Sequence, residues 1–126
     1  MWKSRWGAIW RCCCETILAE KLETAIARSV TNTRMRDFYD MYILTTTQPF
    51  QPETFRVALQ KTAQRRGTVD QMRAMADTIE TIASSSVVQG HWRRYQMKYS
   101  YAADVTWAMA MEAVKDLAAK ALHPDD

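Results

Sequence analysis

Apolar residues recur at helical spacing along most of the chain, and this periodicity limits the fold more than any other feature of the sequence. Only three glycines and three prolines interrupt the 126 residues. Both residue types break helices, whereas the abundant alanine, methionine, glutamine, glutamate, lysine and arginine favour them. No alternating strand pattern is sustained. We therefore expect an all-α domain, a bundle of five to six helices with short loops.

Turn and capping residues set the expected boundaries of the first helices. The first is expected over about 3–28 and the second over about 34–45, after a polar break in which Asn32 or Thr33 provides the N-cap. A third helix begins at Pro52, because proline is well tolerated in a first helical turn.

The rest of the chain divides in the same way. Gly67 ends the third helix, and Asp70 begins a fourth that a serine run at 84–86 ends. Asp104 or Thr106 caps the last helix. A fifth helix is expected between the serine run and the cap of the last helix. Its apolar side should bury Val87, Val88, His91, Trp92, Tyr95 and Tyr99, and His91 should be a hydrogen-bonded core histidine.

Two charged residues stand against the apolar surfaces of the first two helices. Lys21 lies at the border of the first helix's apolar stripe, where a lysine either extends to water or lies against an anion. Asp37 belongs to a helix that is apolar around most of its circumference, which is typical of a buried helix. A buried carboxylate needs a cation or several hydrogen bonds. We therefore expect Lys21 close to Asp37, with Arg34 or Arg36 as alternative cations.

The strings around these residues resemble the nucleotidyltransferase AbiEii/AbiGii toxin family. Its Ala-Glu-Lys-Leu motif stands at 19–22, and its Arg-x-(Lys/Arg)-Asp-x-x-Asp motif stands at 34–40. Members of the family have a polymerase-β-like catalytic half followed by a helical half, and both motifs belong to the helical half. The resemblance continues through 64–68, 92–102 and the final helix, so it spans about residues 15–122.

The resemblance implies roles that the residues alone leave open. It implies that Lys21 lies near nucleotide phosphates and that Asp37 is a catalytic or lysine-orienting carboxylate, so that the two form a remnant catalytic site. It also makes Arg34, Arg36 and Asp40 candidates for substrate binding. Without the resemblance, Lys21 is a surface lysine paired with glutamate neighbours and Asp37 is a first-turn aspartate that the helix dipole favours. Asp40 is then simply an i, i+4 partner of Arg36.

The motifs of the family's catalytic half have no counterpart here. That half carries a Gly-Gly or Gly-Ser loop and an Asp-x-Asp pair that holds the metal, whereas the three glycines of this chain are far apart. The adjacent acidic pair Asp125–Asp126 lies at the tail. We therefore expect 1–14 to be a helical extension outside the family and 15–126 to be the helical half of a truncated or frameshifted toxin, inactive alone.

The resemblance also implies cofactors and partners. For the full-length family it implies Mg²⁺, a nucleoside triphosphate and a tRNA acceptor, together with toxin–antitoxin and phage-defence systems. For this chain we expect no cofactor and no metal site, and either an antitoxin or a separate catalytic half as partner. The alternative is a helical protein-interaction module or homodimeric adaptor without catalysis, and a third option is an RNA-binding domain.

Trp2, Trp6 and Trp10 form a stripe at i, i+4 spacing near the N-terminus. Such a stripe is typical of a membrane-surface helix or of a contact surface, and we favour a contact with an absent half or a second copy, hence a homo-oligomer.

The net charge of +3 allows nucleic-acid contact without indicating it. The three consecutive cysteines at 12–14 are expected to be reduced thiols, and no stretch of the sequence is apolar enough to span a membrane. Together these two features predict a cytoplasmic protein.

Overall fold

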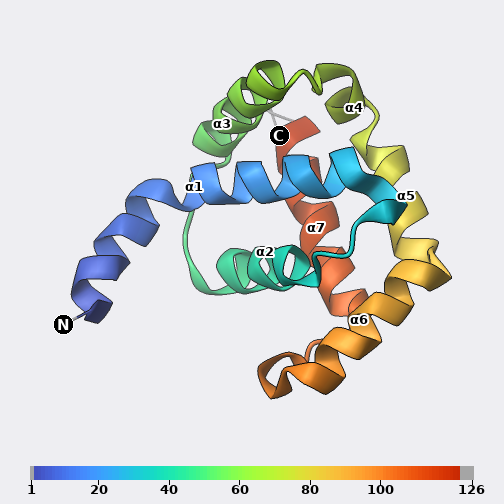
Figure 1. Ribbon diagram of the computed structural model, residues 1–126. Helices are drawn as coiled ribbons and strands as arrows, with labels where there is room; N and C mark the ends of the chain where they lie inside the picture. Colours follow the sequence, from blue (N-terminus) through green and yellow to red (C-terminus); the bar gives the residue numbers. More distant parts are fainter. Residues whose placement is uncertain (1, 123–126) are drawn as a thin grey trace.

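The computed structural model describes the backbone of residues 2–122 and the side chains of residues 14–121. Over these residues the chain forms seven α-helices, two short 3-10 helices and no strand, so the predicted all-α fold is confirmed (Figure 1). The elements are α1 (Trp2–Arg28), η1 (Ser29–Thr31), α2 (Met35–Thr47), α3 (Pro52–Arg66), α4 (Val69–Arg73), α5 (Met75–Ser84), α6 (Ser86–Lys98), η2 (Ser100–Ala102) and α7 (Trp107–Leu122).

The longest helix, α1, lies between α3 and α2 and packs on both (Figure 1). α7 packs against α2, α3 and α5, so it closes the bundle on the side away from the viewer in Figure 1. The side chains between these helices form one continuous apolar core. Its largest fully buried members are Trp92, Phe38, Phe55, Leu18, Leu22, Met41, Met75, Ile79, Ile82, Leu117, Val88 and Val114.

The fourth predicted helix is divided into two. α4 ends at Arg73 and α5 begins at Met75, with Ala74 between them at φ −97° and ψ 14°. The amide N–H of Ala74 donates to the Gln71 carbonyl in a tightened last turn. Met72 and Met75, three residues apart, are both buried, as the helical spacing predicts, but the sequence pattern of one straight helix did not reveal the bend.

The helix α6 buries a narrower stripe than predicted. Val88 and Trp92 are buried as expected, and Trp92 Nε1 donates to the Val105 carbonyl at 3.0 Å. Val87 is 61% exposed and Tyr99 is 36% exposed, so their predicted burial is wrong. His91 is only half-buried, and its Nδ1 lies 2.7 Å from Arg94 Nη2, so it is not a core histidine. The reason is that the helix packs on the bundle along one narrow side.

The caps agree with the sequence in most places. Gly67 ends α3 in the left-handed conformation at φ 72°, and Thr106 Oγ1 accepts a hydrogen bond from the Met109 N–H at 3.1 Å at the start of α7. The predicted cap of α2 is wrong, because Arg34 occupies the N-cap position. The buried Asn32 instead accepts from the Arg34 N–H at 2.8 Å, so it fixes the turn that precedes the helix.

The tryptophan stripe lies outside the part of the chain whose side chains are described. The homo-oligomer expected through Trp2, Trp6 and Trp10 therefore stays a prediction. Within the described residues, no helix has the length and apolar character needed to cross a membrane.

Two glycines should respond in opposite ways to alanine. Gly67→Ala should lower the free energy of unfolding by about 1 kcal/mol, because a left-handed residue with a Cβ is strained even though no atom lies near the new methyl group. Gly90→Ala, inside α6, should raise it by about 0.5–1 kcal/mol, because the new Cβ would meet Arg94 at an ordinary 3.7 Å. Urea denaturation of both variants checks this, and a Gly67→Ala variant at least as stable as the wild type would contradict the assignment of Gly67 as a left-handed cap.

Candidate functional site

The site begins where the chain turns back from α1 into α2. The break at 29–33 contains Ser29, a non-glycine residue at φ 51°, and it places the first turn of α2 beside the second half of α1, at Lys21. Met35, Phe38 and Met41 of α2 are buried. Asp37 projects from the same helix and is only 2% exposed, so its carboxylate requires partners within the protein.

Those partners are two cations. Lys21 Nζ lies 3.2 Å from Asp37 Oδ1, and Arg34 Nε lies 3.2 Å from Asp37 Oδ2. The predicted proximity of Lys21 and Asp37 is therefore confirmed, and the alternative cation Arg34 is engaged as well. Both carboxylate oxygens of Asp37 carry a charge-assisted contact, which fixes the orientation of the group.

Asp40 extends the cluster by one helical turn. Its Oδ2 lies 3.0 Å from Lys21 Nζ, and its Oδ1 accepts from Arg36 Nε at 3.3 Å. The predicted Arg36–Asp40 pair is thus present, and Asp40 raises the pKa of the Arg36 guanidinium above its ordinary value. Lys21 is consequently shared between two carboxylates, one buried and one partly exposed.

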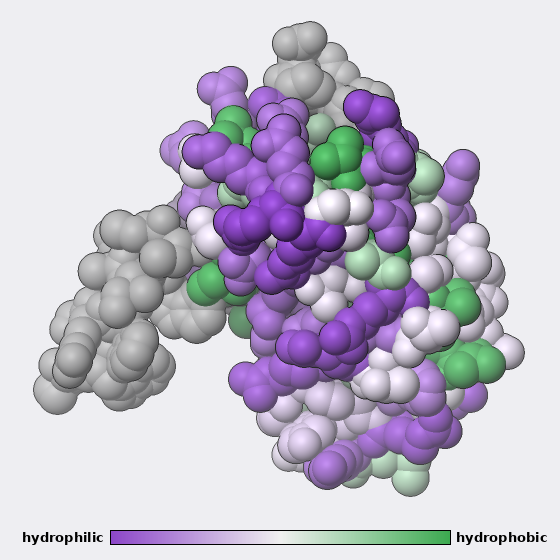
Figure 2. Space-filling view, turned by 45° about the horizontal axis from the view of Figure 1, so that its top comes forward, coloured by the Kyte–Doolittle hydropathy of each residue, from purple (hydrophilic) through white to green (hydrophobic). Residues whose placement is uncertain are grey.

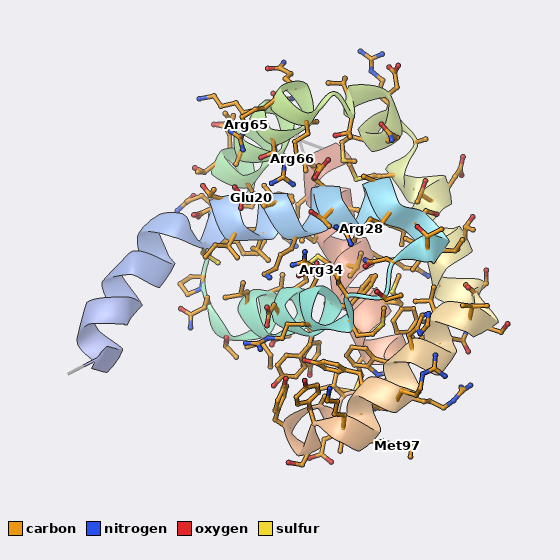
Figure 3. All side chains as sticks on the ribbon, in the orientation of Figure 1. Glu20, Arg28, Arg34, Arg65, Arg66 and Met97 are labelled. Carbon is orange, nitrogen blue, oxygen red and sulfur yellow. The ribbon has the colours of Figure 1, made fainter. Side chains whose placement is uncertain are left out.

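The cluster faces an open cleft of about 240 Å³, lined by Ile17, Glu20, Lys21, Thr24, Arg34, Asp37 and Arg66. Figure 3 shows Glu20 and Arg66 on the same face of the molecule as Arg34, where α1 lies between α3 and α2. Figure 2 shows hydrophilic residues gathered over this face. Pockets for whole drug-sized ligands are usually larger, so this cleft has room for part of a ligand, such as a phosphate chain.

The glutamates beside Lys21 have other partners. Glu20 Oε2 lies 3.8 Å from Arg65 Nη2, and Glu23 Oε1 lies 2.6 Å from Arg66 Nη1. The interpretation of Lys21 as a lysine paired with these neighbours is therefore wrong. The physical reason is the helix geometry, which directs adjacent residues away from one another and toward different helices.

Sequence reasoning missed two buried carboxylates of α1. Glu23 is 3% exposed and also accepts from Thr68 Oγ1 at 2.9 Å, while Glu15 is 6% exposed and accepts from the Gln51 N–H at 2.7 Å. Both glutamates hold the ends of α3 against α1. The only sequence signal was their spacing of two helical turns, which is equally typical of a solvated helix face.

The described residues include neither an exposed thiol nor a group that could hold a metal. Cys14 is free and buried, and burial followed by the nearby Glu15 raises the pKa of its thiol, which disfavours a reactive thiolate. Within the part of the chain that the structure describes, no three histidine, cysteine, aspartate or glutamate side chains come together as metal ligands would.

Comparison with known families decides the class of protein. A family model described as "Nucleotidyl transferase AbiEii toxin, Type IV TA system" matches residues 13–119, which is most of the chain. The chain belongs to the AbiEii toxin family. No curated protein and no solved structure matches it significantly. Membership of the AbiEii family supports a nucleotidyltransferase-like role in a toxin–antitoxin system, with an antitoxin as partner.

The match covers every residue of the charged cluster in this AbiEii chain. The Ala-Glu-Lys-Leu string at 19–22 places Lys21 on α1, and the string at 34–40 places Asp37 and Asp40 on α2. The structure brings these two strings into direct contact. The two motifs that carry the family resemblance, at 19–22 and 34–40, therefore lie next to each other in the fold.

Removing the charge of Lys21 should destabilise the fold. Lys21→Met keeps most of the side-chain stem but leaves Asp37 with one cation instead of two, so we expect a loss of about 1–3 kcal/mol in the free energy of unfolding. Lys115→Met is the matched control, since Lys115 forms an exposed ion pair with Glu80 at 3.2 Å and should change stability by less than about 0.5 kcal/mol. Equal effects in chemical denaturation would show that the Lys21–Asp37 contact does not support the fold.

Proposed function

We propose that this chain provides the lysine–aspartate side of a nucleotidyl-transfer site in a toxin of a toxin–antitoxin system. The observation that carries the proposal is the ammonium group of Lys21, which is shared by Asp37 and Asp40 at the wall of an open cleft. In this proposal Lys21 is the catalytic residue and Asp37 holds it in position. Arg34, Arg36 and Asp40 bind or position the substrate.

The chemistry of Lys21 suits a triphosphate. A lysine ammonium is a compact point charge on a flexible stem, so it can exchange one anionic partner for another. We infer that phosphate oxygens replace Asp40 as the partner of Lys21 while the buried Asp37 continues to hold it. Arg34 and Arg66, which line the same cleft, add positive charge for the same anion.

The geometry of Asp37 favours a positioning role over that of a general base. Its two oxygens contact Lys21 and Arg34, and the side chain is almost fully buried. A base that takes a proton from an acceptor hydroxyl needs a free oxygen within reach of it. We therefore infer that Asp37 orients Lys21 rather than taking the proton from the acceptor.

The transfer itself needs groups that this sequence does not contain. The acceptor oxygen would form a bond to the α-phosphorus, pyrophosphate would leave with the electrons of the broken P–O bond, and a base would take the acceptor proton. In the family resemblance an upstream Asp-x-Asp pair holds the Mg²⁺ that neutralises the triphosphate, and no Asp-x-Asp string occurs in the 126 residues.

We propose that a separate polypeptide segment supplies that catalytic half. In this account 15–126 form the helical half of the toxin, and the residues before the family match at 13–119 are an extension. A role in phage defence and a tRNA acceptor belong to the same proposal, because they follow from the family resemblance. The cytoplasmic location expected from the cysteines of the sequence stays a proposal as well.

The isolated chain should not transfer nucleotides. It lacks the clustered carboxylates that would hold Mg²⁺ against a triphosphate, so incubation with labelled ATP, GTP, CTP or UTP, Mg²⁺ and bulk tRNA should give no labelled product. The measurement is autoradiography of the separated RNA. A labelled product that disappears in the Lys21→Met variant would contradict the proposal that another segment must supply the metal-binding half of the site.

Adding the missing half should restore activity that depends on Lys21. We expect co-expression with the N-terminal half of a full-length relative to give nucleotide transfer, which Lys21→Met reduces by about 10²–10³-fold, as loss of a charge-stabilising group typically does. Asp37→Asn should reduce it as well, because the amide no longer holds the ammonium group.

The matched control for this assay is Lys115→Met, which removes an ion-paired lysine of α7 away from the cleft. It should leave the restored transfer unchanged. If the halves bind one another and transfer proceeds equally with all three substitutions, the chain is a helical interaction module and the proposed roles of Lys21 and Asp37 are wrong.

A further inference from the structure

A second cavity of about 380 Å³ borders the lysine–aspartate cleft, between the start of α2 and the helix α6. Arg34 and Arg36 line it from α2 and the turn before it, and Arg94, Lys98 and Tyr99 line it from α6 and its C-cap. Arg34 also lines the cleft that contains Lys21. The two cavities therefore share a wall, and we call the second one the tyrosine groove.

The tyrosine groove is strongly cationic. Four arginine and lysine side chains line it together with His91, and none of its described lining residues is acidic. From 81 to 103 the sequence contains Arg93, Arg94 and Lys98 but no aspartate or glutamate. Asp40, the nearby carboxylate, is already occupied by Lys21 and Arg36. Arg36 is paired with Asp40 and Arg34 with Asp37, whereas Arg94 and Lys98 form no ion pair with a carboxylate among the described residues. The charge of these two side chains is therefore suited to an anion.

Aromatic rings gather at one edge of the groove, which Tyr95 and Tyr99 line and beside which Tyr39 and Tyr101 pack. The ring centroids of Tyr99 and Tyr101 are 5.4 Å apart, and that of Tyr39 lies 4.9 Å from Tyr101. Tyr99 is 36% exposed and Tyr101 is 46% exposed, so their faces are not used up by the core. Lys98 Nζ lies 5.4 Å from the centroid of the Tyr99 ring. Exposed rings interleaved with cations are typical of surfaces that bind single-stranded nucleic acid.

Tyr95 anchors this aromatic cluster to the fold. Its ring stacks on the buried Trp92 with centroids 5.5 Å apart, and its hydroxyl lies 2.7 Å from the Tyr101 hydroxyl. Burial, followed by the hydrogen bond to Tyr101, raises the pKa of Tyr95 well above its ordinary value, so the group stays neutral at physiological pH. The outer rings are thus held in place before any ligand arrives.

We propose that the tyrosine groove binds a single strand of nucleic acid, with bases stacked on Tyr99 and Tyr101 and phosphates paired with Arg94 and Lys98. Arg34, at the wall between the cavities, then directs the end of the strand toward Lys21 and Asp37. The second step rests on the proposed function, because it makes the strand the acceptor of nucleotidyl transfer. A duplex fits less well, since its bases are stacked on one another and do not offer free faces.

Fluorescence anisotropy with a labelled single-stranded RNA about ten nucleotides long tests the groove directly. Tyr99→Ala should weaken binding at least about fivefold, the lower limit for one stacked base, whereas Tyr99→Phe should bind like the wild type because the ring is kept. Arg94→Gln and Lys98→Gln should each lower the slope of log affinity against log salt by about 0.7, because each removes one phosphate contact.

Arg73→Gln is the matched control for net charge. Arg73 is an exposed arginine of α4, paired with Asp70 at 3.4 Å and outside the groove, so its loss should change neither the affinity nor the salt slope. Thermal unfolding of each variant separates a lost contact from a lost fold. Equal weakening by Arg73→Gln, unchanged binding by Tyr99→Ala in a folded variant, or preference for a polyglutamate peptide over RNA would overturn the proposal.

Failure of the proposed RNA binding can be told apart from failure of the proposed catalytic function. If RNA binding depends on Tyr99 but the restored enzyme transfers nothing, the groove is a nucleic-acid surface and the catalytic assignment fails. If transfer depends on Lys21 but substitution of Tyr99, Arg94 or Lys98 leaves RNA affinity unchanged, the catalytic assignment holds and the proposal that the tyrosine groove binds RNA is wrong.

Discussion

The burial of one carboxylate, Asp37, between two cations is the constraint on which the rest of the structure depends. An unpaired carboxylate at 2% exposure would be strongly unfavourable, so α2 can pack in the core only with Lys21 and Arg34 in place. The same contacts set how α1 and α2 lie side by side. Because Lys21 is partly exposed, the pair also forms the wall of an open cleft. Fold and candidate chemistry are therefore joined in a single interaction.

Polar contacts also connect α1 to the other side of the bundle. Glu15 and Glu23 are buried two turns apart and hold the beginning and end of α3, through the Gln51 N–H and the pair Arg66 and Thr68. Lys21 projects from the same stretch toward α2. A short segment of α1 thus positions both neighbouring helices. The string around Lys21 therefore contributes both to the packing of α2 and α3 on α1 and to the wall of the cleft.

The sequence predicted the features that depend on local pattern. The all-α fold, the boundaries of α1 and α3, the left-handed Gly67 and the meeting of Lys21 with Asp37 follow from periodicity, capping chemistry and the need to pair a buried charge. It did not predict features that depend on tertiary packing. The bend at Ala74 has no local signal such as glycine or proline, and the outer tyrosines stay exposed because α6 packs along one narrow side. The roles proposed for Lys21, Asp37, Arg34, Arg36 and Asp40 stay predictions.

The central claim is that Lys21 exchanges Asp40 for a triphosphate while Asp37 holds it in place. Nitrogen-15 NMR of the lysine ammonium groups tests this most directly, in the assembly of this chain with a catalytic half, before and after saturation with a non-hydrolysable triphosphate and Mg²⁺. We expect the Lys21 signal to shift on saturation and that of Lys115, which pairs with Glu80 away from the cleft, to stay in place. An unchanged Lys21 signal at saturating triphosphate would contradict the claim.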